Sequence, residues 1–210
     1  MGDDLDNVKI KSYHHGALRE ALIAAGEAVL TERGLEGFSL RETARRAGVS
    51  AGAPAHHFGD TRGLLTAIAG LAFRDLTEAL ELAAREPVQS DRVRKLATVY
   101  VRFAVRQRAR FDLMWRSTLL DHENRDFRET RARAFHVFDQ AVAGVDRMVE
   151  IPLDPVLAPS VALWALVHGF ARLAIDGAFG KGEPAIDRAV ETLLPAVLLS
   201  AGCSDAPTPR

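Results

Sequence analysis

The residues with the clearest chemistry lie between positions 38 and 62, where hydroxyl, guanidinium and imidazole groups alternate with small side chains. Such groups donate hydrogen bonds to phosphate oxygens, and small residues let a backbone or a methyl group approach a base edge. The residues that we expect to make these contacts are Ser39, Arg41, Thr43, Arg45, Ser50, Ala51, Gly52, Ala53, His56, His57, Thr61 and Arg62. The chain offers no nucleophile–base pair, phosphate-binding loop or metal-ligand spacing, so we expect neither an enzyme nor a catalytic residue.

Two short helices joined by a tight turn would position these contact residues. Ser39 is a suitable N-cap for the first helix, and Glu42, three residues later, can complete a capping box. Gly48 follows the last apolar position, where glycine adopts a left-handed conformation without a Cβ penalty. Ser50 can cap a second helix at about 51–57. A helix, a glycine turn and a capped helix form the helix-turn-helix pattern, whose second helix enters the major groove of DNA.

The second helix carries a proline that limits its length. Pro54 falls at the fourth helical position, where it would remove the first intrahelical amide bond, so we expect a short or 3₁₀-like helix. His56 and His57 are the polar side chains of this helix. In the alternative, His57 packs against the helix predicted at about 14–33 and only His56 is exposed. Arg45 and Arg46 project about 100° apart, so we expect at least one to face away from DNA.

Residues 39–58, with the following GDTRGLL at 59–65, resemble the DNA-binding domain of the TetR family of bacterial repressors. The resemblance runs from about residue 16 to 73. It implies an all-helical homodimer with a small-molecule pocket in its C-terminal domain. Three positions depart from the family pattern: Ala55 replaces a tyrosine that touches the DNA backbone, Pro54 replaces a helix-forming apolar residue, and Thr61 replaces a lysine.

The composition is that of an ordinary soluble globular protein, with 210 residues, 48% hydrophobic residues, 26% charged residues and a formal net charge of −1. Residues 9–62 hold eight basic and six acidic side chains, so the positive bias of this region is modest. One cysteine, Cys203, excludes an internal disulfide and suits a reducing compartment. The acidic N-terminus is not a signal peptide, and the apolar runs near 161–175 and 189–201 are interrupted or short. We therefore expect a cytoplasmic protein that does not associate with membranes.

Helical periodicity extends through the whole chain, without strand-like alternation or repeats. The main predicted helices span about 14–33, 61–85, 124–149, 156–178 and 184–201, with others from about 90 and at 111–120. We predict an all-α fold of about nine helices, in which an N-terminal helix-turn-helix head of three helices is joined to a C-terminal helical bundle. The predicted domains are a DNA-binding domain at 1–60, a ligand-binding and dimerisation domain at 61–202 and a disordered tail at 203–210.

The C-terminal region carries aromatic and polar side chains that suit a ligand cavity. Trp164 and His168 lie one turn apart on one helical face, and Val167-His168-Gly169 is similar to the Trp-His-Gly motif of one branch of the family. Each residue of the set has a simpler interpretation as core. The candidate ligand-binding residues are Phe103, Phe111, Met114, Trp115, Phe138, Trp164, His168 and Arg172. A basic run at 102–110 lies mostly opposite the apolar face of its helix.

Other features bear on partners and cofactors. The histidine pairs at 14–15 and 56–57 could suggest a metal site, but adjacent histidines on a helix diverge, so we expect no metal and no cofactor. Residues 156–178 and 184–201 are apolar on more than one face, which favours burial against a second copy. The alternative is that they fill the centre of a monomeric bundle.

These observations predict a ligand-responsive transcriptional regulator that binds a palindromic operator as a homodimer. The resemblance implies a repressor that is released by a small-molecule effector. The alternative is a helical small-molecule-binding protein that does not bind DNA.

Overall fold

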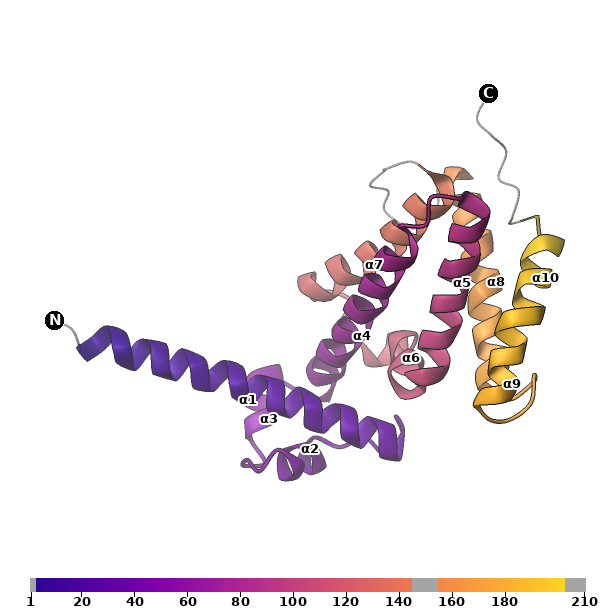
Figure 1. The fold of residues 1–210 in the computed structure, drawn as a ribbon. Coiled ribbons are helices and arrows are strands. Elements are labelled where there is room, and N and C mark those ends of the chain that lie inside the picture. The colour runs from indigo at the N-terminus through magenta and orange to yellow at the C-terminus, as the bar shows by residue number, and fades with distance from the viewer. Residues whose placement is uncertain (1–2, 145–154, 203–210) are drawn as a thin grey trace.

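The computed structural model describes residues 3–144 and 155–202, with side chains from residue 17 onward. This part of the chain is all-helical and contains no strand (Figure 1). Its elements are α1 (Asp3–Arg33), α2 (Leu40–Arg46), α3 (Ala53–Phe58), α4 (Thr61–Ala83), α5 (Gln89–Arg106), α6 (Arg108–Met114), η1 (Ser117–Leu119), α7 (Arg125–Ala143), η2 (Pro155–Leu157), α8 (Ala158–Ile175), α9 (Glu183–Arg188), η3 (Ala189–Leu193) and α10 (Leu194–Ser200). The tail predicted at 203–210 lies outside the described residues, as do residues 145–154.

Three helices form the head, as predicted. The long helix α1 lies across α2 and α3 at the end of the molecule that is remote from α10 (Figure 1). Its residues Leu22, Val29 and Leu30 are fully buried, because their spacing places them on one helical face. The helix begins at Asp3, earlier than the predicted start near 14.

The body is a bundle in which α4 packs along α7, and α5 packs against α8. Leu64, Ile68, Leu96, Phe111 and Val167 are fully buried and belong to one hydrophobic core. This core continues into the head through α1. The predicted boundary at residue 60 coincides with the N-cap of α4, Asp60, but the partition into independent domains stays a prediction.

Two predicted helices differ in length or form from the observed ones. Helix α7 ends at Ala143, where the sequence predicted about 149, because Gly144 adopts a left-handed conformation at φ +70°. From Glu183 to Ser200 the helices α9, η3 and α10 follow one another without a break, and η3 is a π-helical turn. Counted as one rod, they bring the described α-helices to the predicted total of about nine.

One described segment, Pro155–Ile175, is long and apolar enough to cross a membrane by length and composition, although the sequence suggested that its apolar run was interrupted. In the fold it is a bundle helix, because Leu163, Val167 and Phe170 are buried in the core. Its opposite face remains uncovered within the single chain.

Candidate DNA interface and effector cavity

The helix-turn-helix begins at Ser39, which has an extended backbone and whose hydroxyl accepts a hydrogen bond from the Glu42 N–H at 3.5 Å. After α2, Gly48 adopts φ +68° and reverses the chain. The Val49 N–H donates to the Ala44 carbonyl at 3.0 Å, which closes the turn. The cap and the glycine turn therefore occur where the sequence predicts them.

The Glu42 carboxylate does not complete the predicted capping box, because arginines occupy it. It accepts two hydrogen bonds of 2.8 Å from Arg45, one of 2.9 Å from Arg46 and one of 3.3 Å from Arg33. The bonds from Arg45 and Arg46 lower the pKa of Glu42 from 4.5 to about 2. Arg46 also binds Glu32, and its side chain is 19% exposed against 69% for Arg45. Of Arg45 and Arg46, Arg46 is thus the one that is packed against the protein, whereas Arg45 is exposed to solvent.

Helix α3 has six residues and starts two positions later than predicted. Its N-cap is Gly52, and the Ser50 side chain does not cap it; instead, the Ser50 carbonyl accepts from the Ala53 N–H at 3.0 Å. Pro54 therefore lies in the first turn, where its missing N–H has no intrahelical partner to lose. The helix is short as predicted, but Pro54 deletes no helical bond.

Most of the predicted DNA contacts are accessible. The exposed ones are Arg41, Arg45, Ser50, Ala51, Gly52, His56, Thr61 and Arg62, and the half-buried ones are Ser39, Ala53 and His57. His57 contacts the rings of His56 and Phe58, at centroid distances of 5.5 and 6.3 Å. This geometry favours the alternative in which His56 alone is fully presented.

Two predicted DNA contacts have structural roles within the chain. Thr43 is fully buried, and its hydroxyl donates to the Ser39 carbonyl at 3.0 Å, so it cannot reach DNA without unfolding α2. Arg62 donates through Nε and Nη2 to the Leu120 carbonyl at 2.9 and 2.7 Å. Its guanidinium therefore joins the start of α4 to the body.

The recognition helix α3 is fixed closely to α4. Asp60 caps α4 by accepting from the Gly63 N–H at 2.8 Å. A Cβ at Gly63 would lie 1.9 Å from the Phe58 carbonyl oxygen, so no larger residue fits without displacing the end of α3. The first turn of α4 is therefore in close contact with the end of α3.

A second junction joins the head to the body through Arg110 of α6. Its guanidinium lies 3.2 Å from Glu27 of α1 and 2.8 Å from Asp75 of α4. Burial raises the pKa of Glu27, and the neighbouring Arg110 opposes this rise. Further along the chain, the Asp121 N–H donates to the Thr66 hydroxyl at 2.8 Å. The segment from α6 to Asp121 thus contacts both α1 and α4.

A small cavity of about 40 Å³, which we call the aromatic cavity, lies inside the bundle. Its lining consists of Phe73, Leu76, Leu80, Tyr100, Trp115, Arg131, Ala134, Phe135, Phe138 and Trp164. The walls are aromatic and aliphatic, and Arg131 supplies a positive charge. The indole rings of Trp115 and Trp164 lie 5.4 Å apart. The buried Nε1 of Trp115 has no hydrogen-bond partner in the described part of the chain.

Three of the eight predicted ligand residues, Trp115, Phe138 and Trp164, line this cavity. The others lie outside the lining. Phe111 and Met114 are buried core residues, Phe103 packs against the core, His168 contacts Trp115 at a ring distance of 4.9 Å, and Arg172 is bound to Asp112. The structure gives no direct support to these five positions as cavity walls.

A buried polar network borders the cavity. The Tyr100 hydroxyl lies 2.9 Å from His168 Nδ1, and Trp164 Nε1 donates to the same hydroxyl at 3.3 Å. Burial raises the pKa of Tyr100, so the phenol stays protonated. Burial, and secondarily the charge of Arg172, lowers the pKa of His168. A neutral His168 can then accept from Tyr100 at Nδ1 and carry its proton at Nε2.

The sequence missed the contribution of α4 to the cavity. Phe73, Leu76 and Leu80 are spaced three and four residues apart, so they share one face of α4. This spacing was visible in the sequence as core periodicity, but its use as a cavity wall depends on how α4 meets α5, α7 and α8. Among the described side chains, no group of three or more metal-ligating residues occurs; the side chains of His14 and His15 lie outside this part.

Comparisons with known proteins agree with this architecture. Residues 22–68 match the family described as bacterial regulatory proteins of the tetR family, and residues 93–197 match the tetracyclin repressor-like C-terminal domain. A solved protein of unknown function from Rhodococcus sp. RHA1 is 32% identical, with 88% of this chain and 97% of that chain covered and a TM-score of 0.68. No curated protein matches the chain significantly.

Two further structures share the fold. The TetR family transcriptional regulator PfmR from Thermus thermophilus is 23% identical, with 85% of this chain and 97% of PfmR covered and a TM-score of 0.62. A regulatory protein of the tetR family from Rhodococcus RHA1 is 24% identical, with 90% and 98% covered and a TM-score of 0.63. The chain belongs to the TetR family, whose members are transcriptional regulators and not enzymes.

Proposed function

We propose that this protein is a repressor that binds a palindromic operator as a homodimer and releases it when a small molecule enters the cavity within the bundle. One observation carries the proposal: each chain holds a single, very short recognition helix, and the same chain leaves a long apolar face uncovered. Two chains joined through that face would present two recognition helices to one duplex.

The DNA-contacting surface of one head is small. It comprises the exposed side of α2, the turn and the six residues of α3, from which Arg41, Arg45 and His56 extend. Phosphate contacts from so few donors give weak, salt-sensitive binding. Coupling two heads makes the second contact intramolecular, which raises the overall affinity without new contacts. A palindromic operator follows from this requirement, because two-fold protein symmetry is matched by two half-sites.

The uncovered face supports dimer formation. On α8, Val161, Ala165, Gly169 and Leu173 recur at intervals of four residues and are all exposed, Leu173 by 51%. A Cβ at Gly169 would meet no atom within 4 Å inside the chain, so nothing in its own subunit requires a glycine there. Small residues between larger apolar ones let a second helix approach closely. The last helical rod also carries exposed apolar residues, Leu193 and Leu199.

We place the subunit interface on these two helical regions, 156–178 and 184–201. Exposed apolar area of this kind is stabilised by burial against a complementary surface. Two copies of α8 and of the rod from α9 to α10 would pack as four helices around a two-fold axis.

The aromatic cavity is small as it stands. A volume of about 40 Å³ holds little more than a water molecule, whereas drug-sized ligands occupy several hundred Å³. A ligand must therefore displace the walls, which belong to α4, α5, α7, α8 and the segment between α6 and η1. The lining favours an apolar, planar ligand, and an acceptor atom on it would give the unpaired Nε1 of Trp115 a partner.

Wall displacement offers a route to the heads. Helix α4 contributes Phe73, Leu76 and Leu80 to the cavity, and its first turn is fixed to α3 at Gly63. A small tilt of α4 moves both recognition helices and spoils their match to major grooves about 34 Å apart. A ligand that binds only the tilted state shifts the population away from the DNA-binding state.

The experiment is a screen of small aromatic and aliphatic compounds for ligands that raise the melting temperature, followed by an operator-release assay. A true effector should release operator DNA from the wild-type protein. It should bind the Trp164→Ala variant more weakly and release DNA less effectively, while this variant still binds operator. Ligands that stabilise the protein equally in both forms, or that leave operator binding unchanged, would contradict the proposed role of the cavity.

A further inference from the structure

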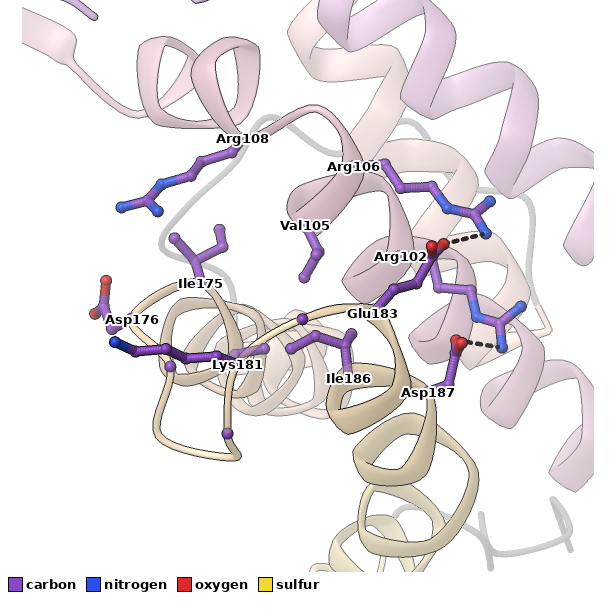
Figure 2. Close-up of a pocket in the computed structure, with 14 residues that line it drawn as sticks. Arg102, Val105, Arg106, Arg108, Ile175, Asp176, Lys181, Glu183, Ile186 and Asp187 are labelled. Carbon is purple, nitrogen blue, oxygen red and sulfur yellow. Dashed lines mark hydrogen bonds and ion pairs between the residues drawn. The ribbon is translucent and has the colours of Figure 1, made fainter.

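A second hollow lies at the corner where the end of α5 and the start of α6 face the loop between α8 and α9 (Figure 2). We refer to it as the corner groove. Its volume is about 640 Å³, within the range of small-molecule sites and far larger than the aromatic cavity. The two share no lining residue, so the corner groove is a separate site.

The floor of the corner groove is apolar. Val105 of α5, Ala174 and Ile175 of α8 and Ile186 of α9 contribute to it. Ala174 and Ile186 are buried by the surrounding helices, which fixes the floor in place. In Figure 2 the side chains of Val105, Ile175 and Ile186 extend into the space between the three elements. This surface suits an aliphatic group.

The rim of the corner groove is cationic. Arg102, Arg106 and Arg108 belong to the basic run of the sequence, and Lys181 extends from the facing α8–α9 loop (Figure 2). Neither the DNA surface nor the aromatic cavity uses these four residues. In Figure 2, Arg108 and Lys181 extend to the same side of the groove, whereas Arg102 and Arg106 extend to the opposite side, toward Asp187 and Glu183. A pair of cations from two facing elements beside an apolar floor is the feature that suggests a ligand.

The cations are held only loosely by the protein. Arg106 lies 3.8 Å from Glu183 and Arg102 lies 3.3 Å from Asp187, and all four side chains are at least one-third exposed. Exposed pairs of this length are weak and screened by salt. Lys181 makes no ion pair within the described residues. A bound carboxylate or phosphate could therefore attract these groups at a small cost, with shorter, charge-assisted hydrogen bonds.

The net charge of the lining indicates which charge the ligand should carry. Four cations face three carboxylates, those of Asp176, Glu183 and Asp187, which leaves a single excess positive charge. A polyanion would be repelled by the carboxylates, whereas a ligand with one negative charge is matched. We propose that the corner groove binds a monoanionic amphiphile, with its acidic group between Arg108 and Lys181 and its aliphatic part on the floor.

Calorimetric titration of the full-length protein with octanoate, below its micellar concentration, tests the proposal. We expect saturable binding of one octanoate per chain that weakens as salt is raised, and at least tenfold weaker binding of octanol and octylamine. The Arg108→Gln/Lys181→Gln double variant should bind octanoate at least tenfold more weakly. The matched control is Arg125→Gln, an exposed arginine of α7 that pairs with Glu129 and is remote from the groove in the sequence; it should bind normally.

Three results would overturn the proposal. Equal octanoate binding by the double variant would place the ligand elsewhere, as would equal affinity for octanol. Binding of the wild-type protein to anionic phospholipid vesicles without any binding of octanoate would identify a membrane surface as the partner. Loss of operator affinity in the double variant, with a smaller salt dependence, would assign the cations to DNA. None of these measurements depends on effector release, so failure here is distinguishable from failure of the proposed repressor function.

Discussion

The guanidinium of Arg62, in the first turn of α4, donates two hydrogen bonds to the carbonyl oxygen of Leu120, 58 residues further along the chain. Leu120 follows η1, and Trp115, a wall of the aromatic cavity, precedes it. The contact therefore connects the segment that borders the cavity to the turn that carries the recognition helix. A residue that the sequence predicts as a DNA contact thus also holds head and body together.

This contact predicts different outcomes for two exposed arginines. Arg62→Met should lower the free energy of unfolding by about 1 kcal/mol, which is less than the roughly 1.5–3 kcal/mol of a hydrogen bond to a charged group, because the site is partly exposed. Arg41→Met should leave stability unchanged within about 0.5 kcal/mol. It should instead reduce the slope of log affinity against log salt by about 1, as expected for one lost phosphate contact. Urea unfolding and operator titrations at several salt concentrations measure both effects, and identical behaviour of the two variants would contradict the assignment.

The recognition helix predicts a gain of affinity from one substitution. Ala55 is exposed on α3 at the position where the family pattern carries a tyrosine that touches the DNA backbone. Ala55→Tyr should tighten operator binding several-fold, because the phenol adds a hydrogen bond to phosphate. Ala55→Phe is the control, since it adds the ring without the hydroxyl. Gel-shift titration should place the phenylalanine variant near wild type; weaker binding by both variants would mean that α3 approaches DNA differently.

The uncovered stripe on α8 predicts which apolar residue governs assembly. Ala165→Arg introduces a charge at the centre of the stripe and should give a folded monomer, because the site is exposed within the chain. Leu82→Arg removes another exposed apolar residue, 66% exposed on α4, and should remain dimeric. Sedimentation velocity separates the two cases. A dimeric Ala165→Arg variant would move the interface away from α8.

The arginine cluster around Glu42 predicts the direction of one pH effect. The folded-state pKa of Glu42 is lowered from 4.5 to about 2, so its carboxylate stabilises the head above pH 4.5 and this contribution disappears as the pH falls toward 2. Glu42→Gln should therefore destabilise the protein at pH 6, and the difference from wild type should shrink between pH 4.5 and 2. Urea unfolding at several pH values measures this trend. A difference that stays constant with pH would show that the charge of Glu42 is not responsible.

Local sequence rules predict the helices and the turn of the head, but not every cap and contact within it. The cap at Ser39 and the turn at Gly48 depend on neighbouring residues alone, and both occur where the sequence placed them. The start of α3 was misplaced by two residues, because a backbone turn to the Ser50 carbonyl replaced a side-chain cap. The partner of Arg62 could not be predicted, since no local rule relates it to Leu120.

The sequence likewise predicts only part of the lining of the aromatic cavity. Aromatic residues in the C-terminal helices suit a ligand site, and three of those predicted as ligand contacts line the cavity: Trp115, Phe138 and Trp164. Phe73 and Tyr100 line it as well, but their role depends on the pairing of α4 with α7 and of α5 with α8. The sequence predicts Arg172 as a ligand contact, whereas Asp112 of α6 binds it in the fold.

Footprinting of the purified protein on the DNA that flanks its own gene is the most direct test of the central claim, that two linked heads read one operator. The wild-type protein should protect an inverted repeat of roughly 15–30 base pairs, with half-sites spaced by whole helical turns, and protection should fade as salt is raised. The monomeric Ala165→Arg variant should lose this protection at the same concentration. Absence of any protected repeat, or equal protection by the monomeric variant, would contradict the account.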